Sequence, residues 1–363
     1  MSSRPSSEPE RVRQITSGLF AGQSGSTWHQ PNADVTLVGG ADRVDDAAWF
    51  RFDGTAEIVV ASDYVRGSEF LLFQLNVLDH YDIGYYLAAA NISDIAAMGA
   101  EPVALTSVVR YPKELSDDDF SAIMRGIRDC CKRYGCHNVG GDIGTAERIF
   151  LSASAIGLNA VGATLTRAGA QPGDAVALSG PTGVALAAMI YFEGRETHGW
   201  RLDAAHENRL ARAWKRVEPE VELGRVLSKS GIATSCQDTS DGLRATVEQI
   251  EQASKVRIDL DTPSVPIDDA VAAVADVSGI PVLDIVFGGS VDFRLLFTVR
   301  PDAVGDIPRS ARVIGAVAPA GRGEQLPGIA WAHQVDPLAG YRTDAPRPSE
   351  VVHADEDAPG YLS

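Results

Sequence analysis

The segment Asn91–Ala100 constrains this chain more than any other, because it sets an amide, a hydroxyl and a carboxylate inside a run of small apolar residues typical of a buried helix. Asn91 and Asp94 are three residues apart and therefore project from one face of a helix. A buried, unpaired carboxylate is costly, so Asp94 needs either a cation or a capping role. Taken alone, the segment fits a metal site and fits equally well a helix-end hydrogen-bonding pattern around Ser93 and Asp94.

Further acidic clusters favour the metal site. They are Asp45-Asp46, Ser62-Asp63, Gly140-Gly141-Asp142, and Asp238 with Asp241, and each is expected at a strand end or in a turn beside a helix. Hard cations such as Mg2+ take oxygen ligands and keep substrate phosphates, which suits aspartates on rigid element ends. The paired glycines before Asp142 would let backbone amides approach a phosphate. A single such cluster is usually a solvated turn or a helix N-cap, but together they predict a metal-dependent nucleotide site.

Charge and composition narrow the class of protein. A net charge of −17 disfavours nucleic acid and anionic membranes as partners. A chain of 363 residues with 45% hydrophobic side chains can bury two medium-sized cores, so we expect two domains. No apolar stretch approaches a transmembrane span, and 4 cysteines in a chain this long indicate a reducing cytoplasm rather than a disulfide framework.

Three other sequence features have structural rather than functional interpretations. Cys130, Cys131, Cys136 and His137 suggest zinc, but adjacent cysteines cannot both face inward from one helix, so we interpret the cysteines as small buried side chains. The stretch 180–183 precedes a helix but lacks the Gly-Lys-Ser/Thr ending of a phosphate loop, which predicts a plain strand-to-helix turn. A lone loop histidine such as His80 is usually solvated.

Glycines, prolines and polar runs give the organisation. Residues 1–30 predict a flexible arm and residues 344–363 a flexible tail. Between them we expect an N-terminal domain over residues 31–162 and a C-terminal domain over residues 163–343. Strands are expected at 58–60, 148–162, 175–178 and 293–299, and helices at 120–135, 183–191 and 243–254, with strands and helices alternating throughout.

The order and spacing of these motifs resemble the superfamily of thiamine-monophosphate kinase, aminoimidazole ribonucleotide synthetase, selenophosphate synthetase and the hydrogenase-maturation carbamoyl dehydratase. The thiamine-monophosphate kinase branch is the most similar. The resemblance runs from about Ala41 to Tyr341 and also includes Leu165–Asp174, Ser240–Leu243, and Gly288-Gly289 followed by Asp292-Phe293. It implies an α/β (α+β) fold of two domains, in which the N-terminal domains of a homodimer pair into a dimer-spanning β-barrel with ATP between the subunits, and the C-terminal domain is α/β.

The same resemblance implies roles for individual residues. The Mg2+ ligands would be Asp46, Ser62, Asp63, Asp94, Asp142, Asp238 and Asp241. ATP would be contacted by Gly141, Asp142, Arg167 and Ser240. No dedicated protein base is implied, because phosphoryl transfer depends mainly on positioning and charge neutralisation.

Departures from the family pattern fall at the acceptor-binding positions. Glu69-Phe70 stands where the resembling kinases have histidine and phenylalanine. The family sequence Gly-Gly-Glu-Asp-Tyr-Glu-Leu becomes Gly288–Leu295, with Ser290-Val291 in place of the first glutamate and Arg294 in place of the second. Glu69, Ser290 and Asp292 are therefore the candidate acceptor-binding residues, and we expect an acceptor other than thiamine phosphate.

The first hypothesis is thus ATP- and Mg2+-dependent transfer of the γ-phosphate to a small metabolite. One alternative is activation of an amide or carbamoyl oxygen by phosphorylation, followed by dehydration or ring closure. A third is a catalytically silent ATP-binding subunit that regulates a partner. The sequence leaves open the identity of the acceptor and the number of metal ions.

Overall fold

Strands with alternating buried and exposed residues form a seven-stranded sheet in the first half of the chain. The structure is a computed structural model that describes residues 25, 27–29, 34–39, 45, 47–52 and 56–320. The sheet order is β1-β2-β3-β4-β7-β5-β6. The strands are β1 (Thr27–His29), β2 (Asp34–Gly39), β3 (Ala48–Phe52), β4 (Ala56–Val65), β5 (Glu101–Tyr111), β6 (His137–Thr145) and β7 (Phe150–Asn159). Only β5 and β6 pair in parallel, and a helix forms the crossover between them.

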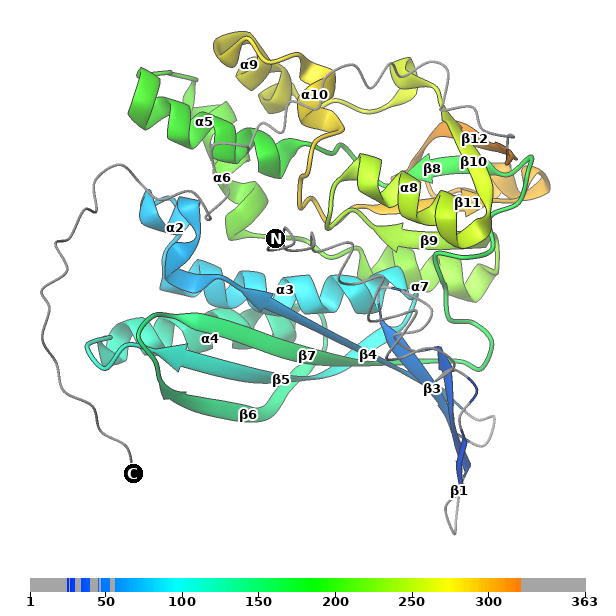
Figure 1. Cartoon of the computed structure of the whole chain (residues 1–363), viewed down its shortest axis with the longest axis horizontal. Coiled ribbons are helices and arrows are strands. Elements are labelled where there is room, and N and C mark those ends of the chain that lie inside the picture. Colours follow the sequence, from blue (N-terminus) through cyan, green and yellow to red (C-terminus); the bar gives the residue numbers. More distant parts are fainter. Residues whose placement is uncertain are drawn as a thin grey trace, which may run out of the picture.

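Two helices cover one face of this sheet (Figure 1). Helix α3 (His80–Ala97) starts with a reciprocal capping box between Asp79 and Asp82, and α4 (Asp117–Arg133) starts at Ser116, whose hydroxyl accepts from the backbone N–H of Asp119. The two helices cross closely at glycines. A Cβ on Gly84 or Gly126 would lie 2.1 Å from a backbone oxygen of the other helix, so only glycine allows this approach.

The second half of the chain forms a five-stranded antiparallel sheet with the order β10-β12-β8-β11-β9. Its strands are β8 (Ala175–Leu178), β9 (Ala233–Asp238), β10 (Val256–Leu260), β11 (Leu295–Val299) and β12 (Arg312–Pro319). The helices of this half are α5 (Val184–His198), α6 (Ala204–Lys215), α7 (Val221–Ser230), α8 (Leu243–Ser254), α9 (Asp269–Ser278) and α10 (Val282–Val286). Shorter elements complete the described chain: η2 (Gly67–Glu69), α2 (Leu71–Gln74), η3 (Thr262–Ser264) and η4 (Pro301–Asp306).

Helix α3 joins the two halves, and Figure 1 shows it lying between the first sheet and the elements of the second half. Most of its residues are buried, because it packs on β4 and β7 on one side and on α6, α7 and β9 on the other. At its start, Asp82 forms an ion pair of 2.7 Å with Arg216, just beyond α6. At its end, Ala97 packs in a core cluster with Leu223 and Leu227 of α7. The segment that is most informative in the sequence is therefore the structural centre of the molecule.

Several predicted elements are confirmed and others are wrong. Strand β8 and helix α8 have the predicted bounds, and all four cysteines are free and buried. The Gly140-Gly141-Asp142 stretch is not a turn but the middle of β6. Strands and helices do not alternate throughout, since β1 to β4 follow one another as antiparallel hairpins. Strand β11 begins two residues later than predicted, because Phe293 adopts a positive φ of 54° that turns the chain before the strand.

Other expectations lie outside what the described chain can address. The predicted arm and tail, residues 1–30 and 344–363, fall outside the described residues except for Gly25 and Thr27–His29. In the single chain the first sheet is open, with β6 at one edge. Among the described residues, the longest apolar helices are still too short or too polar to cross a lipid bilayer.

Candidate nucleotide and metal site

Asp238 is the centre of the candidate site. It is the last residue of β9 and is fully buried. Ser93 of α3 donates from Oγ to its Oδ2 at 2.5 Å, and Ser240 donates to its Oδ1 at 2.8 Å. Burial raises the pKa of this carboxyl, although both serine hydroxyls and the nearby charge of Arg167 oppose the shift. A buried carboxylate so arranged is costly by itself and is stabilised by a cation.

Asp63 of β4 approaches the same place from the first sheet. Its backbone N–H donates to Oδ1 of Asn91 at 3.0 Å, and Asn91 in turn donates to the backbone oxygen of Leu87, which fixes the amide on α3. Burial raises the pKa of Asp63; the backbone N–H of Tyr64 opposes this, and the charges of Asp238 and Asp241 raise it further. Asn91 and Ser93 thus hold the two carboxylates in place, a role the sequence analysis did not assign to them.

Asp241 and Ser240 lie in the turn between β9 and α8. Asp241 is exposed, and one of its oxygens accepts from Gln249 of α8 at 3.3 Å. Gln249 is itself hydrogen-bonded by the buried Gln237, next to Asp238 in the strand. These two glutamines were not singled out from the sequence, because glutamine side chains on a strand and a helix carry no motif.

Arg167 and Asp94 also lie near this centre. The positive charge of Arg167 acts on Asp238, and the backbone N–H of Arg167 donates to Oδ1 of Asp45 at 3.2 Å, which anchors the connection between the two halves. Asp94 follows Ser93 on α3 and is half-buried. Asp46, a predicted Mg2+ ligand, lies outside the described residues.

The structure separates Asp142 and Gly141 from this centre within one chain. The pairing register aligns Asp63, Ala153, Ser107 and Gly141 in one row across β4, β7, β5 and β6. Three strand spacings put Gly141 roughly 14 Å from Asp63. Asp142 also lies on the other face of the sheet, where Arg110 donates to it at 2.5 Å and lowers its pKa.

Ser62 lies on that same open face. Its hydroxyl donates to the backbone oxygen of Ala153 at 2.9 Å and is 3.0 Å from the hydroxyl of Ser154, away from Asp63. Gly141 has a structural reason to be glycine, because a Cβ there would lie 1.7 Å from the backbone oxygen of Ser107. The predicted residues therefore do not form one group in a single chain. Asp63 and Asp238 meet beside α3, Ser62 and Asp142 lie on the opposite face of the sheet, and Gly141 lies on the edge strand β6.

The carboxylates of the first group suit a hard divalent cation. Asp63, Asp238 and Asp241 supply only oxygen donors, and their mutual repulsion contributes to the raised pKa values. Within the described part of the chain, no group of three or more histidine, cysteine, aspartate or glutamate side chains is close enough to bind a metal by itself. The set fits Mg2+ that keeps waters and takes further oxygens from a nucleotide.

The three candidate acceptor residues have partners of their own. Glu69 forms an ion pair with Arg148 in the loop before β7. Asp292 accepts from the backbone N–H groups of Gly183 at 2.6 Å and Ala185 at 2.9 Å, and Ser290 accepts from that of Leu186 at 3.0 Å. Both side chains thus cap the start of α5. The carboxylate of Asp292 fills the place that a phosphate would take, which agrees with a plain turn at residues 180–183.

Comparisons with known proteins identify the family. The family described as AIR synthase related protein, N-terminal domain, matches residues 44–159. Thiamine-monophosphate kinase of Halobacterium salinarum is 34% identical over 263 residues, which cover 70% of this chain and 84% of that protein. Thiamine-monophosphate kinase of Pyrococcus abyssi is 29% identical over 80% of this chain and 89% of its own length.

Solved structures show the same fold. AaThiL complexed with AMPPCP and TMP superposes with a TM-score of 0.74 at 21% identity, over 90% of this chain and 97% of its own. Thiamine-monophosphate kinase from Stenotrophomonas maltophilia gives a TM-score of 0.65 at 27% identity, over 86% of this chain and 93% of its own. Hydrogenase maturation protein HypE in complex with ATP gives 0.60 at 18% identity, over 77% of this chain and 81% of its own, a likeness of fold alone.

Proposed function

Because this chain belongs to the thiamine-monophosphate kinase family and is an ATP-dependent kinase, we propose that it transfers the γ-phosphoryl group of ATP to a small acceptor with the help of Mg2+. The observation that carries the proposal is the meeting of Asp63 and Asp238, from different halves of the chain, beside Asp241 and Arg167. Clustered, buried carboxylates repel one another and are stabilised by a cation, and phosphoryl transfer uses cations next to a nucleotide.

The protein's part in the reaction is positioning. Bound Mg2+ would neutralise the phosphate charge in the transition state. Asp63, Asp238 and Asp241 would hold the ions, with Ser93 and Ser240 orienting the carboxylate of Asp238. Arg167, whose charge acts on Asp238, would contact a nucleotide phosphate.

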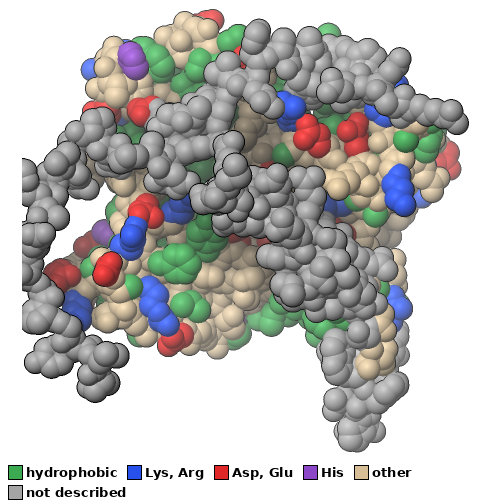
Figure 2. All heavy atoms as spheres, in the orientation of Figure 1, with side chains coloured by type: hydrophobic (Ala, Val, Ile, Leu, Met, Phe, Trp, Pro, Cys, Tyr) green, Lys and Arg blue, Asp and Glu red, His purple; other side chains and the backbone are tan. Residues whose placement is uncertain are grey.

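We further propose that two copies of the chain complete the nucleotide site. Asp142 lies on the opposite face of the sheet from Asp63, and Gly141 lies three strands away from Asp63, so one chain does not bring both groups to one nucleotide. A second copy packed against the open face could supply the missing group. That face carries exposed apolar side chains, visible over β5, β6 and β7 at the lower left of Figure 2. They include Tyr64 on β4 and Phe150 and Leu158 on β7.

Light scattering at micromolar concentration tests this pairing. We expect a dimer, and we expect Leu158→Asp to weaken association and ATP binding together. Leu283→Asp is the matched control, because Leu283 is also an exposed leucine but lies on α10 of the second half. A monomer that binds Mg-ATP normally would contradict the shared site.

Thiamine phosphate is the first acceptor to test, since the kinase relatives are named for it. The expectation of a different acceptor stays a prediction. A glutamate in place of histidine at position 69 would by itself repel a phosphorylated acceptor, but Arg148 pairs with Glu69, and Ser290 and Asp292 cap α5. The ion pair leaves no net negative charge at Glu69 to repel a phosphorylated acceptor.

The decisive assay is incubation with ATP, Mg2+ and a panel of acceptors, following ADP and identifying products by mass. A new phosphorylated species supports the kinase proposal and identifies the acceptor. Release of ADP and phosphate with a dehydrated or cyclised product would instead indicate amide or carbamoyl activation. Nucleotide binding without ADP formation for any acceptor would indicate a silent subunit and refute the phosphotransferase.

A further inference from the structure

Arginines on and just beyond α6 border a pocket in the second half of the chain. Arg209 and Arg212 are three residues apart and share a face of α6, and Arg216 follows its last residue. Arg294, just before β11, lies across the pocket from them. Two carboxylates, Glu218 and Asp292, also line it, so four guanidinium groups face two acids.

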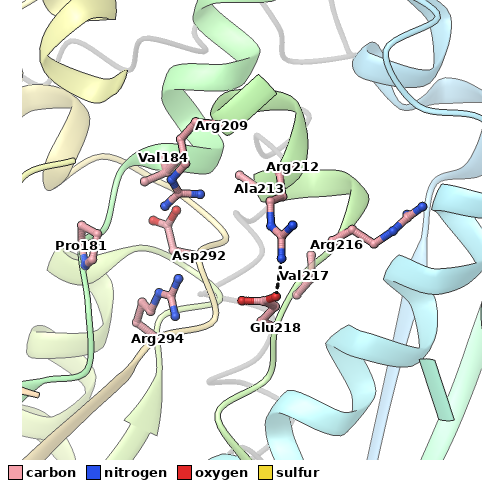
Figure 3. Close-up of a pocket in the computed structure, with 10 residues that line it drawn as sticks. All are labelled: Pro181, Val184, Arg209, Arg212, Ala213, Arg216, Val217, Glu218, Asp292 and Arg294. Carbon is pink, nitrogen blue, oxygen red and sulfur yellow. Dashed lines mark hydrogen bonds and ion pairs between the residues drawn. The ribbon is translucent and has the colours of Figure 1, made fainter. Parts of the chain in front are cut away.

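Figure 3 shows how these side chains are directed. Arg209 and Arg212 descend from α6 toward Asp292 and Glu218, and Arg294 rises toward them from the opposite wall. Arg216 points away from the other three and pairs with Asp82 of α3. Three guanidinium groups from two separate elements therefore converge on the same space.

Each converging arginine keeps part of its hydrogen-bonding fork unused. Arg209 directs Nε and Nη2 to Asp268 at 2.8 Å. Arg212 gives only Nη2 to Glu218 at 2.9 Å, and Arg294 gives only Nη1 to Glu220 at 2.5 Å. A guanidinium group has five N–H donors, so each retains donors for another acceptor.

The two acids that line the pocket are occupied by other donors. Glu218 accepts from Arg133 at 3.0 Å as well as from Arg212. Asp292 accepts from two backbone N–H groups at the start of α5. Neither forms a hydrogen bond or ion pair with Arg209 or Arg294, although the charge of Arg294 acts on Asp292. The pocket thus has surplus N–H donors, while its carboxylates and their neighbours balance the charge of the arginines.

We infer that this pocket is an oxyanion site that binds the phosphate or carboxylate group of a small-molecule ligand through Arg209, Arg212 and Arg294. Planar guanidinium forks match the geometry of such groups, and three of them from two elements define an orientation. The inference goes beyond the proposed kinase reaction and does not require it.

The pocket adjoins the candidate active site without being part of it. The backbone of Arg294 is paired with that of Thr239, the residue after Asp238, with N–H donation to the Arg294 oxygen at 2.7 Å. The aromatic ring of Phe293 packs edge-on against Tyr86, with centroids 5.8 Å apart. Burial raises the pKa of Tyr86, and the nearby charges of Asp63 and Asp238 raise it further. The ligand is therefore either the remote anionic end of the acceptor or a separate effector.

Calorimetric titration of the full-length chain with inorganic phosphate, at low ionic strength and without nucleotide, tests the site. We expect saturable binding that Arg212→Gln and Arg294→Gln each weaken at least tenfold. Arg212 is the safer position, because its side chain is 60% exposed and Glu218 keeps Arg133 as a partner. Arg257→Gln is the matched control, since that arginine pairs with Asp259 on β10, away from the pocket. Asp238→Asn should keep phosphate binding, which separates this site from the nucleotide site.

The outcomes are distinct. Absence of phosphate binding, or equal binding by the wild type and both folded pocket variants, would overturn the inference. If phosphate competes with the acceptor in steady-state kinetics, the site holds the acceptor's anionic end; if inhibition or activation is not competitive, it holds an effector, and both results support the site. Phosphate binding that persists in a chain inactive on every acceptor would refute the kinase proposal and leave the pocket intact.

Discussion

Replacing Asp238 with asparagine should separate two effects of the buried carboxylate: its cost in folding stability and its contribution to Mg-ATP binding. Asparagine has nearly the same shape, and it can still accept from one of Ser93 and Ser240 through its oxygen while donating to the other through its amide. The change therefore removes the charge and keeps the hydrogen bonds. In the metal-free protein we expect Asp238→Asn to unfold at a higher temperature than the wild type at neutral pH.

Asp238→Asn should change thermal stability, Mg-ATP binding and turnover by measurable amounts. Each kcal/mol of relieved burial cost raises Tm by about 2–4 °C for 150–250 residues. Saturating Mg-ATP at about 100 times its Kd stabilises the wild type by about 2.7 kcal/mol, a gain that the variant should largely lose. Turnover should fall at least tenfold, which is about 1.4 kcal/mol of transition-state stabilisation.

The sign of the pH dependence follows from the raised pKa of Asp63 and Asp238. A carboxyl whose pKa is raised by folding stabilises the protein below its ordinary pKa, and this contribution is lost as pH rises through the folded-state value. The Tm of the metal-free wild type should therefore fall over that window. Its difference from Asp238→Asn should shrink as pH is lowered and Asp238 becomes protonated.

Scanning calorimetry across pH, with and without Mg-ATP, measures the Tm of each variant, its pH dependence and its shift on nucleotide binding. Asp292→Asn is the informative contrast, because Asp292 is also an acid with a pKa raised by burial, but it accepts from two backbone N–H groups. Asparagine offers them one oxygen, so that variant should lose about 1–3 kcal/mol. If Asp238→Asn binds Mg-ATP and turns over like the wild type, the metal site is misassigned.

Three further results are expected. Gly141→Ala should lower the free energy of unfolding by about 1–3 kcal/mol in denaturant melts. Gly140→Ala is the control, because Gly140 has a similar positive φ but no atom within 4 Å of an added Cβ, and it should cost clearly less. Equal losses would rule out the clash with Ser107. Asp142→Asn should leave Tm almost unchanged, because the ion pair of Asp142 with Arg110 is exposed. If two chains share the site, the same variant should weaken nucleotide binding at least tenfold by calorimetry. Unchanged affinity would argue against a shared site. The buried cysteines should resist a thiol reagent until the protein unfolds, and rapid native labelling would contradict their burial.

Part of the candidate site was readable from local sequence. The run of apolar residues around Asn91 predicted a buried helix, and a polar face within it predicted partners for its side chains. The aspartates at positions 63, 238 and 241 were recognisable because hard cations and phosphates need oxygen ligands and flanking turns. The glutamines that reach Asp241 gave no such signal, since their role depends on a strand and a helix meeting.

Local pattern also misplaced some residues. Gly140-Gly141-Asp142 was predicted at a strand end or in a turn, with the glycines letting backbone amides approach a phosphate. In the fold these glycines let β6 approach β5 closely, a constraint that exists only once the parallel pair has formed. For Ser290 and Asp292 the acceptor-binding role stays a prediction, and the structure adds that both accept from backbone N–H groups at the start of α5.

By itself, then, the sequence determined the chemistry of the site and the helix at its centre, because residue type and short-range spacing decide both. Only the tertiary structure decided which carboxylates meet. Ser93 and Asp238 are 145 residues apart and come within 2.5 Å, whereas Asp63 and Asp142 share a sheet but face opposite sides. Strand order and register are set by non-local pairing, and a shift of one residue exchanges the two faces of a strand, so no local pattern could fix this division.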